Sequence, residues 1–231
     1  MNRWLLWILR VLALLLLLPP ALILLYRFVP PPITPLMVIR SFEGHPRQSH
    51  WVPAEDISPE MFKSVIASED AKFCRHHGFD WQAIDADLER YEEGVGKLRG
   101  ASTISMQTAK NLFLWPGRTF LRKGLEAPLT VELEFLLPKK RILELYLNII
   151  EMGPGIYGVE AASQNAFHHS AKTLNAREAA LLTAILPSPL KSSASKPSAY
   201  ILRRIGTIEA RTEAVPFDRK RICGVKQDPL W

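Results

Sequence analysis

Glu69 is the residue of this chain whose type and position most strongly indicate chemistry. It closes a run that predicts a helix, with Ser58 as N-cap and Pro59 at the first helical position. Apolar residues at helical spacing place Glu69 on their own stripe, namely Phe62, Val65, Ile66 and Phe73. A carboxylate there lines a cleft, finds partners or takes up a proton. Glu69 is therefore either a general base or a buried structural carboxylate that caps a helix or pairs with an arginine.

A row of polar side chains occupies a later predicted helix, which Ser102 caps and Pro116-Gly117 ends. Thr103, Gln107 and Lys110 share one face of it, with Asn111 alongside, while the apolar residues form an inward stripe. The row is either a solvated surface or a set of groups able to hold sugar hydroxyls or phosphate oxygens.

Basic residues follow in the predicted helix 118–137. Arg118, Arg122 and Glu126 lie one turn apart and Lys123 lies beside them. Neighbouring arginines repel unless an anion or Glu126 offsets their charge, although surface ion pairs of this kind are common and weak. The cluster suits an anionic group held near Glu69. Pro128 is expected to kink or break this helix.

The elements that position these groups begin with an apolar segment at residues 4–26, interrupted by Arg10 and Pro19-Pro20. A helix of this length, at ~1.5 Å per residue, crosses a hydrocarbon core of ~30 Å. A cleavable signal peptide is the alternative, but the run is long and prolines follow it instead of a small-residue cleavage site. We predict an uncleaved anchor with its N-terminus in the cytoplasm.

Composition bounds the remaining possibilities. The 231 residues allow one domain of ordinary size plus an anchor. With 29 Lys and Arg against 23 Asp and Glu, the net charge of +6 suits nucleic acid, a phospholipid surface or a phosphorylated substrate, and does not choose among them. Cys74 and Cys223 make no disulfide framework and show no zinc-site spacing.

Periodicity after Ser58 is helical almost throughout, so the predicted fold class is mainly α. The sequence predicts helices ending near Glu93, over 139–151, over 158–167, from a capping box at Asn175, and a closing helix around Ile205. Residues 36–57 are expected to be irregular. The predicted organisation is a cytoplasmic stub and transmembrane anchor at 1–28, a proline-rich spacer at 29–54, a catalytic domain at 55–214 and a basic, poorly ordered tail at 215–231.

Residues 153–158 literally match the dinucleotide fingerprint G-x-G-x-x-G. That fingerprint requires a preceding strand and a βαβ unit, whereas here a predicted helix precedes it and proline occupies its second position. We therefore interpret the segment as a tight turn into a short helix.

Five motifs occur in order along the chain. They are Glu-Asp-x-x-Phe-x-x-His-x-Gly-x-Asp (69–80), Gly-x-Ser-Thr-Ile-x-x-Gln-x-x-Lys-Asn-Leu (100–112), Arg-Lys-x-x-Glu (122–126), Lys-Arg-Ile-Leu-Glu-x-Tyr-Leu-Asn (140–148) with Gly-x-Tyr-Gly-Val-Glu-Ala-Ala (155–162), and Glu-Ala-Ala-Leu-Leu (178–182) with Leu-Pro (186–187). Together they resemble the motifs of the family 51 peptidoglycan glycosyltransferases. With one anchor and no penicillin-binding domain, the chain is most similar to the monofunctional members.

The resemblance implies a mainly α, lysozyme-like domain in the periplasm, held by a single span at the bacterial inner membrane. It implies polymerisation of lipid II into β-1,4-linked glycan strands with release of undecaprenyl diphosphate. The implied partners are lipid II, the growing glycan chain, the membrane and proteins of cell-wall synthesis or division, with no nucleic acid. A divalent cation, Mg²⁺ or Mn²⁺, is compatible with the diphosphate, although no separate metal motif occurs.

The resemblance also assigns the site. Glu69 corresponds to the base that deprotonates the acceptor 4-hydroxyl, and Glu126 to the second carboxylate near the donor phosphate. The matching substrate-contacting positions are Asp70, His76, Ser102, Thr103, Gln107, Lys110, Asn111, Arg118, Arg122 and Lys123.

The sequence departs from the family pattern at Met106 and Ser105, where the second motif usually has Gln and often Thr, and at Pro128 and Pro138. Two other functions fit parts of the chain. A lysozyme-like fold could cleave glycan, but that leaves the anchor and the basic cluster without a purpose. A non-catalytic relative could bind lipid II or division proteins, but both carboxylates are intact.

Overall fold

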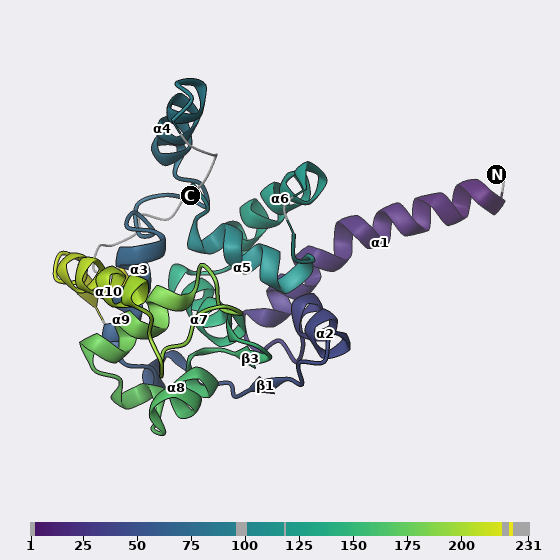
Figure 1. Cartoon of the computed structure of the whole chain (residues 1–231). Helices are drawn as coiled ribbons and strands as arrows, with labels where there is room; N and C mark the ends of the chain where they lie inside the picture. The colour runs from purple at the N-terminus through teal and green to yellow at the C-terminus, as the bar shows by residue number, and fades with distance from the viewer. Residues whose placement is uncertain (1–2, 96–100, 118, 219–221, 224–231) are drawn as a thin grey trace.

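The structure, a computed structural model, describes residues 3–95, 101–117, 119–218 and 222–223 and is mainly helical, which confirms the predicted class (Figure 1). Its helices are α1 (Arg3–Tyr26), α2 (Pro35–Phe42), α3 (Pro59–Glu69), α4 (Trp81–Glu92), α5 (Ile104–Phe113), α6 (Phe120–Leu136), α7 (Lys139–Ile149), α8 (Val159–Phe167), α9 (Ala176–Ile185) and α10 (Ala199–Thr212), with 3-10 turns at Ala54–Asp56 and Ala171–Thr173. The strands are β1 (Gln48–Ser49), β2 (Glu151–Gly153), β3 (Ile156–Tyr157), β4 (Phe217–Asp218) and β5 (Ile222–Cys223).

The apolar helix α1 extends away from the other helices (Figure 1) and is long and apolar enough to cross a membrane. Its C-terminal end is attached to the domain by backbone carbonyls that accept from arginines. Arg141 Nε donates to the carbonyl of Tyr26 at 2.7 Å, and Arg27 Nη1 donates to the carbonyl of Leu136 at 2.8 Å. Such bonds satisfy carbonyls that the end of a helix leaves without partners. The end of α1 is therefore held against α6 and α7.

The prediction that residues 36–57 are irregular is wrong for α2. Thr34 caps this helix by accepting from the backbone N–H of Met37, and Pro35 occupies its first turn. A threonine followed by proline is the same start signal that Ser58-Pro59 gives for α3. Leu36 and Met37 are buried, so the short helix is held by packing onto the core.

Two groups of packed helices meet in the domain. In the α3 group, α3 packs against α9 and α10; in the α5 group, α5 packs against α6 and α7. The central helix α7 is buried nearly all round, as its sequence predicts, and Ile142, Leu143, Leu145 and Tyr146 are fully buried. Glu69 ends the helix α3, and the polar row lies on α5, so the boundary between the groups carries the candidate site.

The helix boundaries correct two expectations and show that Pro128 does not break its helix. Helix α3 ends at Glu69, so Phe73 lies in the following loop, where it is nonetheless buried. The cap of α5 is Thr103 and not Ser102: its hydroxyl accepts from the backbone N–H of Met106 at 3.1 Å. Helix α6 runs without a break through Pro128. A proline near the middle of a helix removes one hydrogen bond, which the remaining bonds of this 17-residue helix outweigh.

The G-x-G-x-x-G segment forms the hairpin of β2 and β3, not a nucleotide-binding turn. The strand β3 also pairs in parallel with β1. A Cβ atom at Gly158, where φ is +82°, would lie 2.6 Å from the carbonyl oxygen of Asn148. This glycine is therefore needed because the hairpin passes close to the end of α7.

Cys74 and Cys223 form a disulfide, so the prediction that the cysteines make no framework is wrong. The described part of the expected irregular tail contains the strand pair β4–β5. That hairpin packs on the core through Phe217, whose ring stacks on Phe62 at 5.8 Å, and this packing brings Cys223 to the loop after α3. The two cysteines are 149 residues apart, so their pairing depends on tertiary structure.

Candidate active site

A cavity of about 530 Å³ opens beside α5 and α6. Seven of the residues predicted to act on substrate line it: Ser102, Gln107, Lys110, Asn111, Arg122, Lys123 and Glu126. Helix α5 presents Gln107, Lys110 and Asn111 to the cavity from its middle and last turn, while it packs on α6 and α7. The predicted polar row is thus brought together with the predicted basic cluster.

Glu69 is not among the residues that line this cavity; it lies next to Gln107, which does line it, and its side chain is 14% exposed. Its three polar contacts are all long. Oε2 accepts from Gln107 Nε2 at 3.3 Å, Oε1 lies 3.3 Å from Ser68 Oγ, and Arg204 Nη2 is 3.6 Å from Oε1. These contacts come from α3, α5 and α10, so the carboxylate is oriented by three helices without a short ion pair among the described residues.

Glu126 is held far more tightly. Its side chain is 3% exposed, Lys123 Nζ lies 2.6 Å from Oε1, and Arg122 Nη1 forms a very short ion pair with Oε2. Arg122 is further fixed by its Nε, which donates to the carbonyl of Gly117 at 2.8 Å. Spacings of three and four residues place both cations on the same side of α6 as the carboxylate. Glu126 therefore organises two positive charges at the cavity wall.

Lys110 and Asn111 complete the polar wall. Burial lowers the pKa of Lys110, and the positive charges of Arg122 and Lys123 act in the same direction, while Glu126 and Glu69 oppose the change. The buried Nδ2 of Asn111 has no hydrogen-bond partner among the described residues. A buried donor without a partner is costly, so Asn111 is suited to donate to a ligand oxygen.

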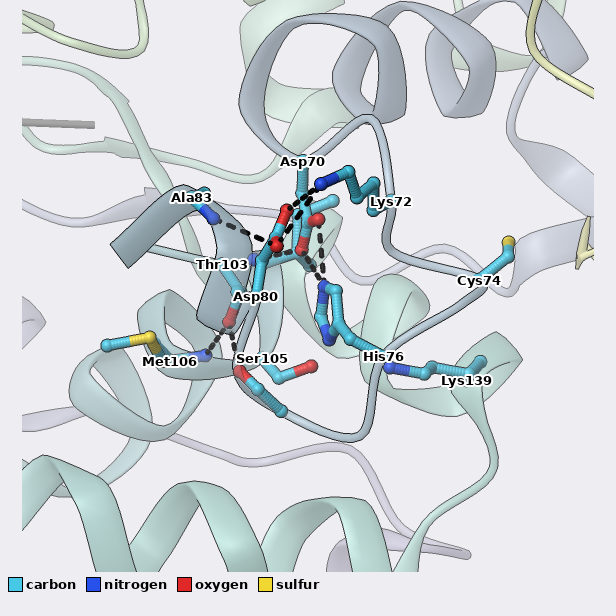
Figure 2. A network of polar contacts seen from close by, with 12 residues as sticks. Asp70, Lys72, Cys74, His76, Asp80, Ala83, Thr103, Ser105, Met106 and Lys139 are labelled. Atoms are coloured by element: carbon cyan, nitrogen blue, oxygen red, sulfur yellow. Dashed lines mark hydrogen bonds and ion pairs between the residues drawn. The ribbon is translucent and has the colours of Figure 1, made fainter. Parts of the chain in front are cut away.

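Asp70, His76 and Thr103 were predicted to contact substrate, but they are not among the residues that line this cavity. Figure 2 shows them in a network that ties the loop after Glu69 to the start of α5. Asp70 Oδ2 accepts from the backbone N–H of Ile104 at 2.9 Å, and His76 Nε2 lies 2.9 Å from Oδ1. Thr103 Oγ1 donates to the carbonyl of Gly78 at 2.6 Å. Because these hydrogen bonds fix the loop that follows Glu69, the three side chains are suited to position Glu69.

Other residues at the site were not found from the sequence. Arg40 and Glu151 line the cavity and pair at 3.1 Å, and burial of Glu151 raises its pKa against the lowering effect of Arg40. Arg204 approaches Glu69 from α10. The start signal of α2 could have located Arg40 on a helix, whereas nothing local indicates Arg204. Arg118, a predicted substrate contact, lies outside the described residues.

Within the described ranges, no group of three or more His, Cys, Asp or Glu side chains lies close enough together to hold a metal ion. The two carboxylates that line the cavity, Glu126 and Glu151, are each paired with a cation. These donors are therefore already engaged and do not fit a metal ion held by the protein itself.

Comparison with known proteins places this geometry in context. Residues 36–213 match the family model described as Transglycosylase. A protein of Rhodospirillum centenum named biosynthetic peptidoglycan transglycosylase is 52% identical over 92% of both chains. Proteins with the same name from Caulobacter vibrioides and Pseudomonas entomophila are each 52% identical, over 89% of both chains and over 81% of this chain and 82% of the relative.

Proposed function

The chain belongs to the transglycosylase family, and from that premise we propose how its residues divide the work of building glycan. The enzyme is a peptidoglycan glycosyltransferase with a lysozyme-like domain, and its substrates are lipid II and the growing glycan chain. The observation that carries the proposal is a contrast between two carboxylates: Glu69 is loosely held and bonded to Gln107 of the cavity wall, whereas Glu126 fixes two cations of that wall.

In the proposed reaction, Glu69 accepts the proton of the acceptor sugar's 4-hydroxyl. The hydroxyl oxygen then forms a bond to the donor's anomeric carbon, and the bond from that carbon to the diphosphate oxygen breaks. The leaving lipid diphosphate keeps the electron pair. A base must be free to take up a proton in the transition state, which agrees with the long contacts of Glu69.

The departing diphosphate develops negative charge, which Lys110, Arg122 and Lys123 oppose from the cavity wall. Glu126 keeps the Arg122 and Lys123 side chains in place between turnovers. Asn111 supplies a neutral donor beside them, and Ser102 and Gln107 are placed for sugar or phosphate oxygens. The carboxylates of the cavity are already paired with cations, so they are not suited to hold Mg²⁺ or Mn²⁺ at the diphosphate.

Glu69→Gln tests the proposed base. The amide keeps the shape of the side chain but cannot accept the proton, so polymerisation of lipid II should fall by ~10²–10⁴-fold while lipid II binding persists. Purified variants would be incubated with lipid II and the products analysed for β-1,4 glycan. Retained polymerisation would contradict the base. Shortening of preformed glycan by the unaltered enzyme would favour the lysozyme-like alternative, and binding without any product the non-catalytic one.

The apolar helix α1 is consistent with a membrane anchor. We extend this to a single span of the bacterial inner membrane, with the N-terminus cytoplasmic and the cavity in the periplasm. Support comes from the fixed attachment of α1 beside α6 and from a substrate that carries a lipid. Proteins of cell-wall synthesis or division are proposed partners on the same side.

Deletion of residues 1–28 tests the role of the anchor. Loss of α1 should reduce activity on lipid II in bilayers more than on a detergent-solubilised short-chain analogue, because only the former needs the cavity placed at the membrane. Equal losses in the two assays would contradict a positional role for α1.

A further inference from the structure

A buried tyrosine is connected to the proposed base through Gln107. The hydroxyl of Tyr146, on α7, donates to Gln107 Oε1 at 3.2 Å, and Gln107 Nε2 donates to Glu69 Oε2 at 3.3 Å. Tyr146 is fully buried, whereas Gln107 lines the cavity. The three side chains therefore form a chain of hydrogen bonds from the core of the α5 group to the last residue of α3.

Which side chain donates and which accepts along this series of hydrogen bonds follows from the chemistry of each group. A glutamine amide has one end that only accepts and one that only donates, so its orientation decides which end meets the carboxylate. Burial raises the pKa of Tyr146 well above its usual value, with the charges of Glu69 and Asp70 acting in the same direction. Its phenol thus keeps its proton and remains a donor, which holds the oxygen end of Gln107 toward α7.

We propose that Tyr146 is a positioning residue for the polymerisation reaction, which fixes the amide of Gln107 so that its N–H group faces Glu69. This inference rests on the proposed base role of Glu69. Without the phenol hydroxyl, the amide can rotate and turn its oxygen toward the carboxylate, which disfavours the charged base. Its resemblance to the family motif identifies Gln107 as a substrate-binding residue. Its hydrogen bonds to Tyr146 and Glu69 indicate a second role, which is to orient the base.

The first experiment is Tyr146→Phe in the full chain. The substitution keeps the ring in the core and removes the donor, so kcat for lipid II polymerisation should fall by ~5–10-fold, the value of about one hydrogen bond. KM should change little, and the acid limb of the pH–rate profile should move to higher pH. Tyr91→Phe is the control: Tyr91, on α4, is 53% exposed and makes no hydrogen bond to Gln107 or Glu69 among the described residues, so that variant should keep the profile of the unaltered enzyme.

A double-mutant cycle separates positioning from packing. In a Gln107→Met background there is no amide to orient, so adding Tyr146→Phe should cost almost nothing further. Equal effects of Tyr146→Phe in both backgrounds, an unchanged rate and pH profile, or a Tyr146→Phe protein that fails to fold would each overturn the inference. Active Glu69→Gln would instead overturn the base itself, so the two failures are distinguishable.

Discussion

Glu69 and Glu126 are the two carboxylates of the proposed reaction, and the protein holds them in opposite ways. Glu126 is almost inaccessible and is paired with Arg122 and with Lys123, the latter at 2.6 Å. Glu69 is more accessible, and its contacts are 3.3 Å or longer. A carboxylate engaged by two cations is a poor proton acceptor, whereas a loosely held one can take a proton without breaking a strong bond. This difference in contacts is why we assign Glu126 to positioning the cations and Glu69 to accepting the proton.

The two sites also differ in where their partners come from. The cations of Glu126 lie three and four residues before it on the same helix, so α6 alone supplies its charged partners. Glu69 instead ends its helix and meets Gln107 of α5 and Arg204 of α10. Its orientation depends on how the α3 group and the α5 group meet. Substitution of Glu126 should therefore lower stability as well as rate, whereas substitution of Glu69 should lower the rate and leave stability nearly unchanged.

The largest expected contrast is in stability. Glu126→Gln leaves Arg122 buried beside a neutral amide and should reduce the free energy of unfolding by about 3 kcal/mol, the lower part of the range for breaking a buried ion pair. Glu69→Gln breaks only long contacts and should change it by less than ~1 kcal/mol. Urea unfolding of both variants measures the difference.

Replacing Arg122 by Met together with Glu126→Gln provides the control, because it removes the stranded charge. The double variant should recover part of the lost stability. Equal destabilisation by the two single glutamine variants would show that Glu69 is as much a structural carboxylate as Glu126, the alternative that its apolar stripe leaves open.

The sequence predicts the parts of this site that one helix builds and misses the parts that depend on contacts between distant segments. The Arg122–Lys123–Glu126 cluster depends on helical spacing, and its geometry is as expected. Helix starts at Ser58 and Asn175 also depend on local caps and are confirmed. What depends on distant segments is missed: the disulfide, the approach of Arg204, and the turn of Asp70 away from the cavity.

Motif matching has a related limit. Asp70, His76 and Thr103 belong to the motifs that resemble the family, and a motif does not say whether a residue meets the substrate or its neighbours. The backbone N–H of Ile104 donates to Asp70, and the carbonyl of Gly78 accepts from Thr103, only when the loop after Glu69 folds onto α5. Their role as supports of Glu69 becomes visible only in three dimensions.

A smaller effect is expected from the charge of Lys110, which interacts electrostatically with both carboxylates. Because burial lowers its pKa, the cation is lost at lower pH than for an ordinary lysine. The affinity for the donor diphosphate should therefore fall as pH rises from neutrality to the ordinary lysine pKa of 10.5, with KM for lipid II increasing by up to ~10-fold over that range. KM measured across this range checks the expectation.

Lys110→Arg is the matched variant, because a guanidinium stays charged throughout that range. Its KM should be nearly independent of pH, even if higher overall. The titration of Lys110 affects stability in the opposite direction to its effect on substrate affinity. Because burial disfavours the charged lysine, the contribution of Lys110 to the free energy of unfolding is present above its unfolded pKa. That contribution is lost as pH falls through its lowered folded pKa. An alkaline rise in KM that persists in Lys110→Arg would assign it to another group.

The smallest expected effect compares one cation from each carboxylate, Arg204 near Glu69 and Lys123 beside Glu126. Both side chains are partly exposed, at 28% and 45%, so solvent screens their charges. Arg204→Gln should change kcat by about threefold and leave KM alone, because Arg204 faces the base and not the cavity wall. Lys123→Gln should raise KM by a similar factor and leave the pH–rate profile unchanged. Steady-state kinetics of both variants on lipid II separates the two patterns, and a matching change in KM for Arg204→Gln would place that arginine among the substrate contacts.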